Sequence, residues 1–168
     1  MHEETAPTFE VDVSNCPILV HIHGRANFLN CSPLRSFFRK MFDEGLSDFK
    51  LDFSDCVGMD STFLGILAGA AIETSEGDPK GEIQLTGLSD RNLQLVKSLG
   101  LHRIVSLVEE SDIVDSTAGA KAVGLDNEVQ SEAQQKEMLI DAHEELVKID
   151  KSNESKFQDV LTFLKNED

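Results

Sequence analysis

Residues 51–67 constrain the fold of this chain more than any other segment. Apolar and polar side chains alternate at its start, as they do in a strand with one buried face. After a polar turn, the chain continues as an apolar helix whose first residues are Asp60, Ser61 and Thr62. The pattern therefore predicts a strand that leads through a short loop into a helix, with two hydroxyl groups in the first helical turn.

These hydroxyl groups would lie where a helix attracts an anion. Backbone N–H groups of the first turn have no partner inside the helix, and the helix dipole is positive at this end. A phosphate is favoured there, and phosphorylation of Ser61 would supply one. The simpler alternative is that Asp60 or Ser61 only caps the helix, and the local pattern alone favours this alternative.

Strand and helix patterns alternate up to Val108. Strands are expected at residues 8–13 and 18–23, joined by turn-forming residues and paired with each other. The clearest helix has Ser32 as its expected N-cap and then an apolar stripe of Leu34, Phe37, Phe38, Met41 and Phe42. A paired start followed by alternating helices and strands predicts an α/β fold with a mixed sheet.

The helix after Ser61 has one side made of small residues. Gly65 and Gly69 lie four residues apart, and we expect this spacing to permit close packing on a sheet. A membrane dimerisation motif is not expected, because the apolar run is too short to span a bilayer.

The last third of the chain is an acidic extension. Residues 109–168 carry more than half of the chain's net charge of −16. A short helix and a linker are expected over residues 111–130. Capping boxes begin at Ser131 and Ser155, so two amphipathic helices should follow, the second with a stripe of Phe157, Val160, Leu161 and Leu164.

The sequence thus divides into a domain at residues 1–110 and a helical extension at residues 111–168. The extension is expected to fold back on the domain, while pairing with a second copy as a homodimer or docking on a partner remain alternatives. We expect the extension to modulate the domain without carrying its switch.

Charge and composition exclude several classes of function. A net charge of −16 repels phosphodiester backbones, so direct nucleic-acid binding is not expected. The sequence shows neither a secretory signal pattern nor a membrane-spanning run, so a cytoplasmic protein without membrane insertion is expected. Cys16, Cys31 and Cys56 lack CxxC spacing, which argues against a disulfide framework or a zinc site.

No motif predicts catalysis, a cofactor or a metal. Nucleophile elbows, phosphate-binding glycine loops and paired catalytic acids are missing, so no enzymatic activity is expected. His21 and His23 would share one face of a strand, which suits a metal, but no third ligand is visible at a telling spacing. We interpret them as surface histidines. His143 lacks the second histidine of a zinc-protease motif, and Ser116, in a second Asp-Ser-Thr sequence, is expected in an ordinary turn or cap.

The sequence Met-Asp-Ser-Thr-Phe-Leu-Gly-Ile-Leu at residues 59–67 resembles the STAS domain signature of anti-sigma factor antagonists, which has the form Asp-Ser-Ser/Thr-Gly-Leu-Gly. Residues 23–27, the helix from Pro33, residues 82–88 and the segment from 92 to 108 are similar to further elements of that family. The resemblance covers roughly the first two thirds of the chain. Phe63 stands where the family usually has glycine.

The resemblance implies a STAS-like mixed β-sheet with helices packed mainly on one face. It also implies that an anti-sigma factor serine kinase phosphorylates Ser61, with Thr62 as the alternative site. The implied partner-binding loop comprises Asp60, Ser61, Thr62, Phe63, Gly24, Arg25 and Asn27. The unphosphorylated protein would bind the kinase and so release a sigma factor, phosphorylation would break the contact, and a serine phosphatase would restore it.

The sequence is also compatible with two other functions. The chain could be a STAS-type adaptor or scaffold subunit of a larger complex, such as a transporter or stress-signalling assembly, with Ser61 serving only as a helix cap. It could also be a module that holds a small ligand, a nucleotide or lipid, near Asp60.

Overall fold

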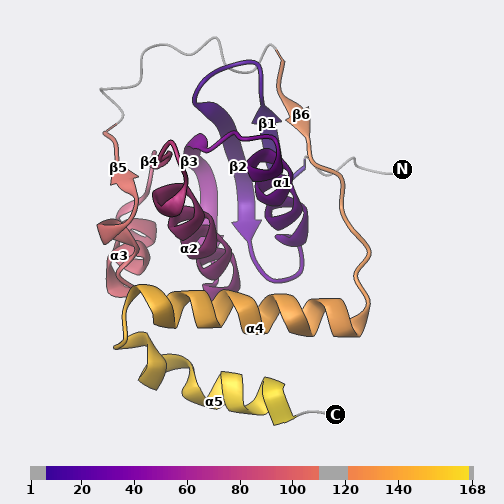
Figure 1. The fold of residues 1–168 in the computed structure, drawn as a ribbon, viewed down its shortest axis with the longest axis vertical. Coiled ribbons are helices and arrows are strands. Elements are labelled where there is room, and N and C mark those ends of the chain that lie inside the picture. Colours follow the sequence, from indigo (N-terminus) through magenta and orange to yellow (C-terminus); the bar gives the residue numbers. More distant parts are fainter. Residues whose placement is uncertain (1–6, 110–120, 167–168) are drawn as a thin grey trace.

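The computed structural model describes residues 7–109 and 121–166, and within these ranges the sheet has six strands in the order β5-β4-β3-β2-β1-β6 (Figure 1). The strands are β1 (Phe9–Asp12), β2 (Ile18–Ala26), β3 (Asp48–Met59), β4 (Glu82–Thr86), β5 (Ser106–Leu107) and β6 (Val123–Gly124). β1 is antiparallel to both β2 and β6, whereas β2, β3, β4 and β5 run parallel to one another. The mixed sheet with an antiparallel start is confirmed.

The helices of the described residues are α1 (Ser32–Asp43), α2 (Ser61–Glu76), α3 (Asp90–Ser98), α4 (Glu132–Ile149) and α5 (Asn153–Asn166), with a short 3-10 turn, η1 (Leu101–Arg103). α1 and α2 lie against one face of the sheet, and α4 runs across the end of this layer with α5 beneath it (Figure 1). Within the described ranges, each helix is too short or too polar to span a bilayer.

The core lies between the sheet and the helices. Strand residues alternate as expected, so that Ile18, Val20 and Ile22 are buried while the residues between them are half-buried on the other face. The stripe of α1 faces the same core, where the ring of Phe38 meets that of Phe49 edge-on at 5.0 Å. Among the described residues, those of β2 on the opposite face of the sheet are half-buried or exposed, and none of them is fully buried.

Two expected helix starts differ from the structure, and a third is confirmed. Ser32 already belongs to α1, so Cys31 is the N-cap residue, and Cys31 makes no side-chain cap hydrogen bond. α5 begins at Asn153, two residues before Ser155. At Ser131 the capping box is formed as expected, since Ser131 and Gln134 exchange side-chain to backbone hydrogen bonds.

A short helix and a linker were expected over residues 111–130, and the described part of this segment, residues 121–130, contains no helix. Residues 121–130 contain the short strand β6, which pairs with β1 at the edge of the sheet opposite β5. Ser116 and its neighbours lie outside the described residues. The extension therefore adds a strand to the sheet as well as two helices.

The small side of α2 packs against α4 and not against the sheet, so the predicted role of the two glycines was wrong. A Cβ atom at Gly65 would lie 2.1 Å from the backbone oxygen of Ala142. At Gly69 the nearest contact would be the flexible side chain of Glu145, at 3.3 Å. Of the two glycines, Gly65 is thus the one at which the backbone of α4 approaches α2 closely.

Polar contacts join α4 and α5 of the extension to the domain, which confirms that the extension folds back on it. Arg35 of α1 forms a 2.6 Å ion pair with Asp141 of α4. The fully buried amide of Asn153 donates to the carbonyl oxygens of Leu99 at 2.9 Å and Leu146 at 2.8 Å. Because buried amides are costly without partners, these bonds fix where α5 starts.

Candidate functional site

The junction of β3 and α2 forms the candidate site, and Asp60 organises it. β3 ends at Met59, and the N-cap Asp60 has an extended backbone with φ −110° and ψ 175°. Its Oδ1 accepts a 2.9 Å hydrogen bond from the backbone N–H of Phe63. Its Oδ2 accepts another 2.9 Å bond from the N–H of Phe28, in the loop between β2 and α1. One carboxylate therefore caps α2 and ties two loops together.

The loop between β2 and α1 is held by its own asparagines. Asn30 Oδ1 accepts from the N–H of Asn27 at 2.9 Å, and Asn30 Nδ2 donates to the carbonyl of Arg25 at 2.7 Å. The tip of this loop exposes Phe28 and Leu29, which are 41% and 74% accessible. Two exposed apolar side chains thus lie in the loop that binds Asp60.

The predicted loop residues from β2 are placed at different distances from Asp60. Asn27 directly follows β2, next to the residue whose N–H binds Asp60. Gly24, with φ +70°, and the exposed Arg25 lie within β2, where they pair in register with Cys56 and Gly58 of β3. Asn27 and Asp60 are brought together, whereas Gly24 and Arg25 lie further back along the strand.

Ser61 is the less buried of the two hydroxyl-bearing residues at this junction, and it is half-buried. Thr62 is only 3% accessible, and Phe63 is fully buried. The ring of Phe63 stacks on Phe9 and meets Phe53 edge-on, each at 6.1 Å. Phe63 therefore fills the core beneath the loop and does not offer its side chain to a partner.

His143 of α4 lies directly over Ser61. Its Nε2 is 2.8 Å from Ser61 Oγ, and its Nδ1 is 2.7 Å from the carbonyl oxygen of Leu139. Because a carbonyl only accepts hydrogen bonds, Nδ1 must carry a proton, so the neutral ring presents Nε2 as the acceptor for the serine hydroxyl. The imidazole is 4% accessible, and Phe157 of α5 packs against it edge-on at 5.0 Å.

The negative charge of Asp60 acts on the buried thiol of Cys31. Burial, and after it the negative charge of Asp60, raises the pKa of the Cys31 thiol to about 12. Burial also raises the pKa of Cys56. Both thiols stay protonated and behave as small core residues.

Comparison with known proteins identifies the domain that carries this site. A family model described as "Mlab, STAS domain" matches residues 6–109. The chain belongs to the STAS family. A comparison with curated proteins returned no match.

Solved STAS structures share the fold of this domain. The anti-sigma factor antagonist SpoIIAA in its unphosphorylated form is 16% identical, with a TM-score of 0.50 over 60% of this chain and 86% of that one. SpoIIAA of Bacillus in the phosphorylated form is also 16% identical, with a TM-score of 0.50 over 62% of this chain and 94% of that one. A putative anti-sigma factor antagonist of Thermotoga maritima is 20% identical, with a TM-score of 0.51 over 59% of this chain and 84% of that one.

His143 lies outside the STAS match, in the extension of the chain. Reasoning from the sequence missed it, because a lone histidine beside glutamates on a helix has no signal that links it to a serine 82 residues away. Only the packing of α4 on Gly65 brings the two side chains together. The site therefore combines a STAS loop with a residue supplied by the extension.

Proposed function

We propose that this protein is an anti-sigma factor antagonist-like regulator that is switched by reversible phosphorylation of Ser61. The unphosphorylated form binds an anti-sigma factor serine kinase and so releases a sigma factor. Phosphorylation breaks that contact, and a serine phosphatase restores it. The shared fold with SpoIIAA, a protein solved in unphosphorylated and phosphorylated forms, supports this proposal.

The observation that carries the proposal is that Asp60, and not Ser61, caps α2. Asp60 accepts the capping hydrogen bond from Phe63, so the hydroxyl of Ser61 is not needed to cap α2. Among the described residues, Ser61 Oγ has His143 as its hydrogen-bond partner. Thr62, the alternative phosphorylation site, is buried. A modifying enzyme therefore finds one hydroxyl at this helix terminus that can be altered without removing the cap.

A phosphate at Ser61 would change the electrostatics of the surface more than its shape. Phosphoserine adds a charge of about −1.5 to −2 at neutral pH. The positive N-terminal end of the α2 dipole stabilises the charge of the phosphate. The neighbouring Asp60 adds a second negative charge to the same surface. An acidic or closely packed partner surface would then be repelled although the domain stays folded.

Phosphorylation of Ser61 also requires that His143 of α4 moves away from it. Ser61 Oγ and His143 Nε2 are in hydrogen-bond contact, so a phosphate on Ser61 has no room unless the imidazole moves. After it moves, a protonated imidazole can donate a charge-assisted hydrogen bond to the phosphate. Access of the kinase to Ser61 thus depends on a local displacement of α4.

The same contact favours one alternative, in which the protein is an adaptor or scaffold subunit that is not phosphorylated. In that case His143 keeps Ser61 covered, and the exposed Phe28 and Leu29 supply the contact with a larger complex. The two functions differ in one measurable property, which is whether Ser61 accepts phosphate.

The test is incubation of the full chain with ATP and a candidate anti-sigma factor serine kinase from the same genome, followed by intact-mass measurement. One added phosphate is expected on the parent and on the Ser75→Ala control, which removes an exposed hydroxyl further along α2. Ser61→Ala should take up none. Phosphate that persists in Ser61→Ala, mapped to Thr62 or Ser116, would refute the assignment of the site. A parent protein that is never phosphorylated by any such kinase would favour the adaptor.

A further inference from the structure

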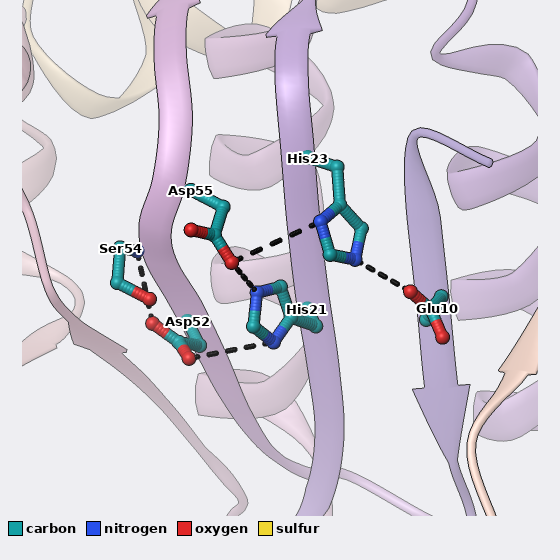
Figure 2. A network of polar contacts seen from close by, with 6 residues as sticks. All are labelled: Glu10, His21, His23, Asp52, Ser54 and Asp55. Carbon is teal, nitrogen blue, oxygen red and sulfur yellow. Dashed lines mark hydrogen bonds and ion pairs between the residues drawn. The ribbon is translucent and has the colours of Figure 1, made fainter. Parts of the chain in front are cut away.

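A polar cluster lies on the open face of the sheet, on the side away from the helices. Glu10 comes from β1, His21 and His23 from β2, and Asp52 and Asp55 from β3 (Figure 2). The two imidazole rings stack with their centroids 4.3 Å apart and their planes 14° from parallel. Three carboxyl groups thus surround two imidazoles on three neighbouring strands.

An irregularity in the pairing of β2 with β3 brings Asp55 to this face. His21 pairs with Asp52, but His23 pairs with Asp55, so β3 has one more residue than β2 between the two pairs. In a regular strand, residues three apart point to opposite faces, whereas a bulge re-aims one of them. Ser54 and Asp55 are accordingly both exposed. The bulge places Asp55 beside the two histidines as a third potential ligand, which the spacing of these residues in the sequence does not indicate.

Asp55 lies between nitrogen atoms of the two rings. Its Oδ2 is 2.7 Å from Nε2 of His21 and 3.9 Å from Nδ1 of His23. One potential ligand atom from each residue lies within 4.8 Å of the others. Atoms that bind Zn²⁺ tetrahedrally at about 2.0–2.2 Å are roughly 3.4 Å apart, so small rotations of these side chains bring all three around one ion.

The other nitrogen of each ring faces a further carboxylate. His21 Nδ1 is 3.5 Å from Asp52 Oδ2, and His23 Nε2 is 2.5 Å from Glu10 Oε1 (Figure 2). Histidines that bind metals commonly donate their second N–H to a carboxylate, which orients the ring and makes the ligating nitrogen more basic. Both histidines have this support, which a pair of ordinary surface histidines does not require.

We propose that His21, His23 and Asp55 bind one divalent transition-metal ion, with Glu10 and Asp52 as supporting carboxylates. Two imidazoles and one carboxylate suit Zn²⁺ and similar ions, and water can complete the coordination because the Asp55 side chain is 60% accessible. A cation also relieves the repulsion among the three carboxylates in a chain of net charge −16. The ion joins β2 to β3 on the face of the sheet opposite α2.

Titration of the full chain with ZnCl₂ by isothermal calorimetry tests this site. The experiment uses a Cys16→Ser background, because Cys16 is an exposed free thiol that could bind Zn²⁺ itself. One ion per chain is expected, together with a higher melting temperature when Zn²⁺ is present. His23→Ala and the isosteric Asp55→Asn should abolish saturable binding. Glu10→Gln should weaken it by about 10–100-fold, because it removes a supporting carboxylate and leaves the three ligands in place.

Two control variants separate this site from general binding to an acidic protein. Glu82→Gln removes a carboxylate from the neighbouring strand β4, and His102→Gln removes a histidine from η1. Neither should change the affinity for Zn²⁺. The proposal is overturned if the parent shows no saturable binding, or if His23→Ala and Asp55→Asn bind as tightly as the parent. Unchanged affinity in Glu10→Gln would overturn the supporting role of Glu10.

Discussion

Ser61 and His143 are 82 residues apart in the sequence and are joined by a 2.8 Å hydrogen bond between Oγ and Nε2. The serine begins α2 in the STAS domain, and the histidine comes from α4 in the extension. This contact makes the environment of the Ser61 hydroxyl depend on the position of α4.

Replacing His143 with alanine should make Ser61 a better substrate for its kinase. The smaller side chain leaves room for a phosphate where the imidazole now lies, so phosphate incorporation should be several-fold faster, as followed by intact mass over time. Lys151→Ala, at an exposed position just beyond α4, serves as the control and should leave the rate unchanged. A His143→Ala rate at or below that of the parent would show that α4 does not limit access.

Gly65→Ala should lift α4 away from α2, whereas Gly69→Ala should not. The added Cβ at position 65 would meet the backbone oxygen of Ala142 at 2.1 Å, and such overpacking costs about 1–3 kcal/mol. The same change at Gly69 meets only the flexible Glu145 side chain, so the better helix propensity of alanine should stabilise the protein by up to about 1 kcal/mol. Urea unfolding measures both variants. Equal stabilities would mean that the close contact at Gly65 is not formed in solution.

The extension should contribute directly to the stability of the domain. Leu146 of α4 is fully buried in the common core, so Leu146→Ala should lower the free energy of unfolding by about 2–5 kcal/mol. Val129 is fully exposed in the linker before α4, and Val129→Ala should change this free energy by less than about 0.5 kcal/mol. A Leu146→Ala protein as stable as the parent would indicate that α4 is not packed on the domain.

Ser61→Asp should imitate the phosphorylated protein only in part. The carboxylate carries a single charge, whereas phosphoserine adds about −1.5 to −2 and has three acceptor oxygens. The affinity of the kinase for this variant should therefore fall between its affinities for the unmodified and the phosphorylated protein, as measured by calorimetry. Identical affinity for the variant and the unmodified protein would argue against an electrostatic switch.

The sequence predicted the α/β fold with a mixed sheet and a strand leading into α2 because these rest on local patterns, whereas the STAS assignment rested on the resemblance at residues 59–67. The polar turn expected after the alternating residues is instead part of β3, which continues to Met59. Alternation in β3, the stripe of α1 and the polar start of α2 are each visible within a dozen residues. The capping box at Ser131 is another local pattern, and it formed as predicted. Ser61 as the phosphorylation site remains a prediction.

What the sequence did not reveal depends on packing between distant elements. The small side of α2 can pack against either a sheet or a helix. The length and polarity of the linker before α4 do not show which of these two elements it contacts. His143 gains its environment only after α4 has docked on Gly65. Asp55 points to the side of His21 only because β3 contains a bulge, which regular alternation does not predict.

If phosphorylation of Ser61 switches partner binding, the anti-sigma factor kinase must bind the two forms of the protein with different affinities. Calorimetry on the unmodified chain and on the same chain phosphorylated at Ser61 should give a dissociation constant at least about tenfold higher for the phosphorylated form, a difference of about 1.4 kcal/mol. Ser61→Ala, treated with kinase and ATP in the same way, should retain the affinity of the unmodified chain. Equal affinities for the phosphorylated and unmodified forms would show that phosphorylation of Ser61 does not switch partner binding.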